Sequence, residues 1–130
     1  MAIAKQIYVN LPVKDLKKSM AFFSALGFGF NPQYTDENAA CLILGDNLYS
    51  MLLVESFFKT FISKDVVNAK VATEVLVAFS VGTRQEVDSL VAKAVNAGGK
   101  AHREPADHGF MYQHSFEDLD GHIWEVLAYT

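Results

Sequence analysis

The chain lacks the features of disulfide-rich, nucleic-acid-binding and membrane proteins. Its 130 residues include one cysteine, Cys41, so no disulfide can form within the chain and a reducing compartment is expected. The formal net charge is −4 and the basic residues are scattered, whereas nucleic-acid binding needs a basic surface. No signal segment opens the chain, and no apolar run approaches the roughly 20 residues that span a bilayer. We therefore expect a cytoplasmic protein without nucleic-acid or membrane partners.

What the chain does contain is an ordinary globular composition, with 51% hydrophobic and 20% charged residues. Its length suits one domain, residues 1–130, or two small halves sharing one core. Asp15 is suited to cap a helix whose apolar residues recur at helical spacing and which Gly27 ends. The apolar positions of this helix are Leu16, Met20, Phe23 and Leu26. Strands are expected over residues 7–13, 28–32, 39–44 and 48–54.

The second half of the chain repeats this order of elements. A strand over 74–81 precedes a capping box of Thr83 and Glu86, and the following helix ends at Gly98. Further strands are expected over 100–103, 110–116 and 123–129. The repeat predicts an α+β fold of two βαβββ modules in tandem, forming a curved mixed sheet around a cleft. Module one covers 5–55, a connecting segment 56–73, and module two 74–130.

Residues 55–72 break the strand pattern, because Phe57, Phe58 and Phe61 crowd a short stretch that polar residues follow. We expect a short helix and a loop. The aromatic residues either cover one end of the core or form a lid over a pocket.

Each module has one helix, which can cover only one face of its sheet. We expect the other face to line the cleft. The alternation of side chains assigns this face to Tyr8, Asn10, Leu76, Ala78, Gln113, Ser115 and Glu125. The alternative registers place Val9, Val77, His114 and Trp124 there.

Glu125 is the residue on which the functional question depends. It is a carboxylate in the middle of a strand that is apolar on both faces, so it is paired, liganded or hydrated. It either binds a ligand, acts as a general acid or base, or makes an internal hydrogen bond to Tyr8, Asn10 or Gln113.

Two stretches, NLPVKDLKKSMAFFSALGF and FEDLDGHIWEV, resemble the vicinal-oxygen-chelate superfamily. This superfamily includes glyoxalase I, bleomycin-resistance proteins, fosfomycin-resistance enzymes and extradiol dioxygenases. The resemblance implies that metal ligands of the family fall on Tyr8, Leu76, Glu125 and, within one residue, Leu52. Only Glu125 is a usual ligand, so we expect neither a metal nor another cofactor. Ser115 stands where extradiol dioxygenases have a catalytic tyrosine, which argues against that reaction.

These features predict a protein that binds a small organic ligand in the cleft between the modules, and the resemblance implies a homodimer. The negative charge favours a neutral or cationic ligand. The alternative is an enzyme of the same superfamily, a lyase, an isomerase or a dioxygenase-related protein, acting on a small oxygenated substrate. In that case Glu125 is the acid, the base or a metal ligand, and Tyr8 or Ser115 holds a developing oxyanion.

Overall fold

The computed structural model describes residues 2–130 and has the expected α+β architecture. The chain forms two compact units, Met1–Val67 and Asn68–Thr130. The boundary between them falls inside the segment 56–73 that the sequence predicts as a connection. Each unit is described by itself.

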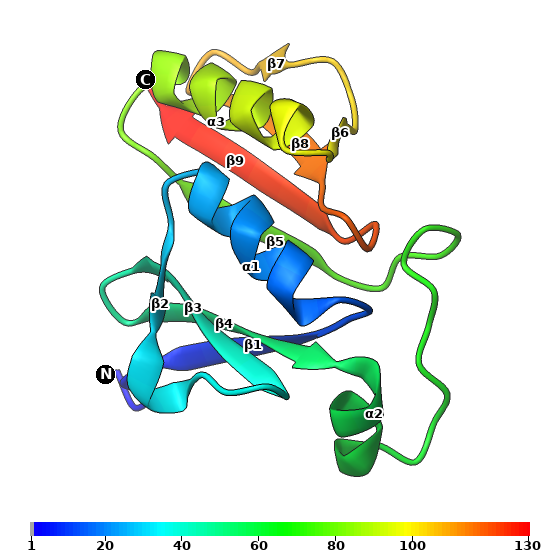
Figure 1. The fold of residues 1–130 in the computed structure, drawn as a ribbon. Coiled ribbons are helices and arrows are strands. Elements are labelled where there is room, and N and C mark those ends of the chain that lie inside the picture. The colour runs from blue at the N-terminus through cyan, green and yellow to red at the C-terminus, as the bar shows by residue number, and fades with distance from the viewer. Residues whose placement is uncertain (1) are drawn as a thin grey trace. The chain divides into compact units, whose positions relative to one another are not determined.

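The first unit is a four-stranded sheet with the order β1-β4-β3-β2 (Figure 1). Its strands are β1 (Ile7–Val13), β2 (Gly29–Asn31), β3 (Ala39–Gly45) and β4 (Leu48–Val54). β1 and β4 are parallel, and the other two pairs are antiparallel. The turn between β3 and β4 has Asn47 in the left-handed region, at φ 62°, which asparagine tolerates better than most residues.

Helix α1 (Leu16–Ala25) covers one face of this sheet (Figure 1). Its N-cap is Asp15, as expected, whose carboxylate accepts a hydrogen bond from the Lys18 amide. Gly27 follows the helix at φ +104°, a conformation that favours glycine. The buried stripe runs through Leu16, Ser19, Phe22, Phe23 and Leu26. Met20, expected on this stripe, is only half-buried, because the stripe shifts by one position toward Ser19 and Phe22.

The second unit has the same topology, which confirms the predicted repeat. Its sheet has the order β5-β9-β8-β6, with β7 also paired to β8. The strands are β5 (Leu76–Ser80), β6 (Lys100–Ala101), β7 (Ala106–Asp107), β8 (Met111–Glu117) and β9 (Ile123–Tyr129). The outer strand is thus two short pieces, where the sequence predicts one strand and a loop. β5 and β9 are parallel, like β1 and β4.

Helix α3 (Arg84–Asn96) packs on β8 and β9. Thr83 accepts a hydrogen bond from the Glu86 amide, and the Glu86 carboxylate accepts one from the Gly82 amide. The capping box is therefore present, with its return bond shifted by one residue. In the sheet beneath, the rings of Phe116 and Trp124 stack in parallel at 6.3 Å and are fully buried. Burial of a side chain the size of Phe116 stabilises the fold by about 1.5–3 kcal/mol.

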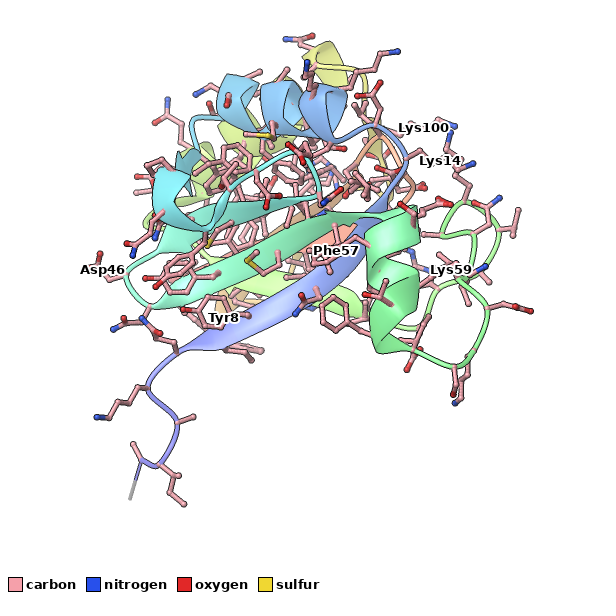
Figure 2. The ribbon with its side chains drawn as sticks, turned by 60° about the horizontal axis from the view of Figure 1, so that its bottom comes forward. Tyr8, Lys14, Asp46, Phe57, Lys59 and Lys100 are labelled. Atoms are coloured by element: carbon pink, nitrogen blue, oxygen red, sulfur yellow. The ribbon has the colours of Figure 1, made fainter. Side chains whose placement is uncertain are left out.

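A short helix, α2 (Glu55–Phe58), continues directly from β4 into a 3-10 turn, η2 (Lys59–Phe61). α2 lies against β1 and β4, at the end of the sheet remote from the turn at Asp46 (Figure 2). Phe57 and Phe58 are half-buried, and Phe61 is 68% exposed. The aromatic residues thus cover this end of the first unit only in part.

Candidate functional site

The second sheet separates its side chains into two faces. Tyr112, His114 and Phe116 of β8 lie on the side of α3, where the Tyr112 hydroxyl donates a hydrogen bond to Asp88 of that helix. The side chains that alternate with them, Gln113 and Ser115, therefore belong to the opposite face, which we call the open face. Glu125 of β9 is paired with Ser115 and shares that face. The alternative register, with His114 and Trp124 on the open face, is wrong.

Glu125 stands in the middle of this open face. It is paired with Ala78 on β5 and with Ser115 on β8. Leu76, two residues before Ala78, is 54% exposed. Glu125 is half-buried, and within residues 2–130 no hydrogen bond or ion pair engages its carboxylate. The internal hydrogen bond to Gln113 that the sequence left open is therefore not formed.

The first sheet likewise has an open face, opposite α1, which carries Tyr8, Asn10, Tyr49 and Met51. The rings of Tyr8 and Tyr49 stack at a centroid distance of 5.0 Å and an interplanar angle of 12°. The Tyr8 hydroxyl donates to Gln6 Oε1 at 2.8 Å, and Asn10 Nδ2 donates to the Tyr8 carbonyl at 3.2 Å. Both predicted residues of β1 thus lie on this face, which Figure 2 shows with Tyr8 labelled.

Leu52 needs a correction. The sequence assigned it, within one residue, to the surface that binds the ligand. In the structure it is fully buried and is paired with Leu11 and Ala40 on the side of α1. The residue of β4 on the open face is Met51, which is paired with Asn10. Successive side chains of a strand point to opposite faces of the sheet. An error of one residue therefore exchanged Met51 on the open face for Leu52 on the buried face.

The Tyr8 phenol lies near two other phenols and a thiol. Partial burial raises the pKa of its phenol, and repulsion from the ionised forms of Tyr49, Cys41 and Tyr34 raises it further. Burial also raises the pKa of the Cys41 thiol.

The acidic turn after β8 serves the fold. The carboxylate of Asp118 accepts hydrogen bonds from the backbone amides of Asp120 and His122, and from the indole Nε1 of Trp124, each at 3.0 Å. The motif that carries the sequence resemblance thus closes the β8–β9 hairpin. The sequence of the turn predicts that Asp118 accepts hydrogen bonds from nearby backbone amides. The hydrogen bond from the indole depends on the buried position of Trp124, which the turn sequence does not define.

A second group of polar side chains lies between α3, β7 and β8, and sequence reasoning missed it. The Arg84 guanidinium pairs with Asp107 at 3.0 Å and lies 4.4 Å from the centre of the Tyr112 ring. The Tyr112 hydroxyl donates to Asp88 at 2.6 Å, which raises the pKa of Tyr112. The hydrogen bond from the Gly109 amide and the charge of Arg84 lower the pKa of Asp107. This group ties the short strand β7 to the helix.

His114 belongs to this second group. Its Nε2 lies 2.9 Å from the Arg103 carbonyl. Its buried Nδ1 has no hydrogen-bond partner among residues 2–130, and Asp88 Oδ1 lies 4.0 Å from it. Its location on the side of α3 agrees with the sequence prediction.

The described residues do not fit the metal that the fold family implies. Leu52 and Leu76 carry no donor atom, and the Tyr8 hydroxyl proton is engaged by Gln6. Across residues 2–130 no three His, Cys, Asp or Glu side chains gather as a metal site would require. No helix in the described part of the chain is long and apolar enough to cross a membrane.

Comparison with known proteins identifies the fold family. Residues 5–126 match the family model of the Glyoxalase/Bleomycin resistance protein/Dioxygenase superfamily. The solved structure of hypothetical protein SA1046 from S. aureus is 34% identical, with a TM-score of 0.80, and the match covers 98% of this chain and 95% of that one. No curated protein matches the chain significantly.

Two further solved structures share the fold at lower identity. A glyoxalase/bleomycin resistance protein/dioxygenase family enzyme from Burkholderia phytofirmans PsJN is 19% identical, with a TM-score of 0.79 and coverage of 95% of this chain and 97% of that one. The fosfomycin resistance protein FosX from Mesorhizobium loti is 14% identical, with a TM-score of 0.70 and coverage of 99% and 95%. The family model spans almost the whole chain, and the two βαβββ units have the matching topology. The protein therefore belongs to the glyoxalase/bleomycin resistance protein/dioxygenase superfamily.

Proposed function

We propose that this protein binds a small organic molecule on the open faces of its sheets, with Glu125 as the principal charged contact. The observation that carries the proposal is the carboxylate of Glu125, which lies on an interior strand of its sheet and has no partner within residues 2–130. A carboxylate that makes no hydrogen bond within the protein can accept one from a ligand without giving up an existing contact. The surroundings combine apolar Leu76 with polar Gln113 and Ser115, a mixture typical of small-molecule sites.

The charge distribution favours a neutral or cationic ligand. The first unit has six basic and six acidic residues, whereas the second has five basic and nine acidic residues. The whole net charge of −4 therefore arises in the unit that contains Glu125. An anionic ligand at Glu125 is repelled both by this carboxylate and by the unit around it.

The names of related proteins support a small-molecule ligand. One structural relative is named a fosfomycin resistance protein, and the family name includes bleomycin resistance. Both compounds are organic molecules much smaller than a protein partner.

The proposal is tested with a screen of matched compounds that share a ring or chain and differ in carrying an amine, an amide or a carboxylate. Binding is measured by thermal shift and then by calorimetry. We expect amines to bind best and Glu125→Gln to weaken their binding about tenfold or more, because the charge-assisted contact is lost. The matched control is Glu104→Gln, at an exposed loop position, which should leave affinity unchanged. If the Glu125→Gln variant binds amines as tightly as the wild-type protein does, the proposal is contradicted.

A second function, catalysis, is favoured by the pairing of Glu125 with Ser115. A free carboxylate can move a proton, and a hydroxyl on the neighbouring strand can donate a hydrogen bond to a developing oxyanion. Tyr8, the other candidate for that role, already donates its proton to Gln6. If the protein is an enzyme, Glu125→Gln abolishes turnover of an identified substrate while its affinity changes little, and Ser115→Ala lowers kcat more than it raises KM. Unchanged turnover in both variants excludes this function.

A further inference from the structure

The stacked pair of Tyr8 and Tyr49 is a binding platform whose ligand chemistry the structure indicates. β1 is an edge strand of its sheet, and within residues 2–130 the only strand paired with it is β4, which carries Tyr49. One side of the Tyr8 ring therefore rests on Tyr49, and in the described part of the chain no strand of the same sheet covers the other side. Tyr8 is 41% exposed, although an aromatic ring gains free energy from burial.

The hydroxyl of Tyr8 helps to fix the platform in place. Its hydrogen bond to Gln6 Oε1 at 2.8 Å and the 12° stack on Tyr49 hold the ring from two directions. The ring is thus already oriented before a ligand stacks on it. Binding therefore costs less side-chain conformational entropy at Tyr8.

The polar atoms beside the platform are acceptors. Asn10 uses its Nδ2 to donate to the Tyr8 carbonyl, and its Oδ1 makes no hydrogen bond with residues 2–130. The Gln6 oxygen accepts from Tyr8 and has a second lone pair. The titratable groups whose ionisation acts on the Tyr8 phenol are Tyr49, Cys41 and Tyr34, and none of them is a cation. The faces of two electron-rich rings, bordered by oxygens, attract positive charge and N–H donors.

We propose that Tyr8 and Tyr49 form a stacking subsite for a planar aromatic ring that carries positive charge and N–H groups. The inference rests on the proposed function, since it names the ligand class that the open face of the first sheet takes. Tyr8 occupies a position that the family resemblance gives to a metal ligand. In this chain the Tyr8 ring at that position instead stacks face to face with the ring of the ligand.

The experiment uses three probes with the full chain. Proflavine is a planar, cationic acridine with two amino groups, 1-pyrenesulfonate is planar and anionic, and tetraethylammonium is cationic without a plane. Fluorescence titration measures the two dyes, and calorimetry measures the third compound. We expect proflavine to bind at least about tenfold more tightly than either comparison compound, because only proflavine combines stacking with favourable charge.

The variants separate the ring from its surroundings. Tyr8→Leu and Tyr49→Leu should each weaken proflavine binding about five- to tenfold, whereas Tyr8→Phe, which keeps the ring, should stay within about twofold. Phe110→Leu removes a still more exposed aromatic ring from the second unit and is expected to leave proflavine affinity unchanged. Asn10→Asp should strengthen proflavine binding and Asn10→Lys should weaken it. Thermal unfolding of each variant shows whether the fold is kept.

Three results overturn the inference: no proflavine binding, equally tight binding of 1-pyrenesulfonate, or binding that neither tyrosine variant weakens. Failure of this inference is distinct from failure of the proposed function. If amines bind through Glu125 while proflavine does not depend on Tyr8, the subsite is excluded and the proposed function stands. If proflavine depends on Tyr8 while Glu125→Gln leaves amine binding unchanged, the subsite stands and the role of Glu125 is excluded.

Discussion

The indole Nε1 of Trp124 donates a hydrogen bond of 3.0 Å to the buried carboxylate of Asp118. This bond joins the turn between β8 and β9 to the core beneath α3. The same carboxylate also accepts from two backbone amides, so one side chain satisfies three donors. The stability of the second unit therefore depends strongly on Asp118.

Asp118→Ala should destabilise the protein by about 3 kcal/mol, because it leaves three donors without their acceptor in a buried place. Chemical denaturation monitored by Trp124 fluorescence measures the change. Asp46→Ala, in the exposed turn between β3 and β4, is the control and should change stability by less than about 0.5 kcal/mol. Similar losses in both variants contradict the assigned role.

Asp118 should also make stability depend on pH. Burial raises the pKa of this carboxyl, against the lowering effects of His122 and of the hydrogen bonds from Trp124 and Asp120. Between the ordinary carboxyl range and the raised pKa, the folded state holds a proton that the unfolded state has lost. The free energy of unfolding therefore falls as pH rises through that window. Asp118→Asn should remove this pH dependence. Denaturation of both proteins across mildly acidic pH measures the free energy of unfolding. If it changes with pH in the same way in the wild type and the variant, the role of Asp118 in the pH dependence is refuted.

Gly121→Ala should destabilise the hairpin turn. Gly121 has a φ of +93°, and an added Cβ would lie 2.8 Å from the Lys70 backbone nitrogen and 2.9 Å from the Ala69 carbonyl carbon. The left-handed conformation and this backbone clash together cost about 2 kcal/mol or more. Gly29→Ala is the matched control, because its Cβ meets no atom within 4 Å and its φ is not positive. Thermal unfolding of the two variants should differ clearly, with Gly29→Ala close to wild type.

Tyr112 and Asp88 should be energetically coupled. Their hydrogen bond of 2.6 Å joins β8 to α3, yet the Asp88 side chain is 57% exposed, so water replaces part of what is lost. A double-mutant cycle of Tyr112→Phe and Asp88→Ala should give a coupling of about 1 kcal/mol. Denaturation of the four proteins measures it. Additive effects would mean that the bond does not contribute to stability in solution.

Local patterns in the sequence predict much of the fold. Residues 48–54 and 123–129 are strands with the expected bounds, and the caps at Asp15 and Thr83 form as expected. These features depend on residues close together in the chain. The broken edge formed by β6 and β7 was not foreseen, because short strands depend on their pairing with β8.

The sequence predicted which site residues share a face only where the alternation of side chains along a single strand decides it. Glu125 and Ser115 lie on the predicted face because alternation along β8 and β9 is clear. Leu52 was misplaced because the register of β4 against β1 joins segments about 40 residues apart, which local spacing does not define. The stack of Tyr8 on Tyr49 depends on that same register and could not be read from the sequence.

The order of strands in each unit has a consequence for how the chain becomes a sheet. In both units the last strand made, β4 or β9, is inserted between the first strand of the unit and the strand that directly precedes it in the chain, β3 or β8. During synthesis, β5 has no partner in its sheet until residues 123–129 leave the ribosome. A stop codon shortly before Ile123 thus removes the centre of the second sheet and with it Glu125. Premature termination there leaves two separated edges, which are exposed to aggregation.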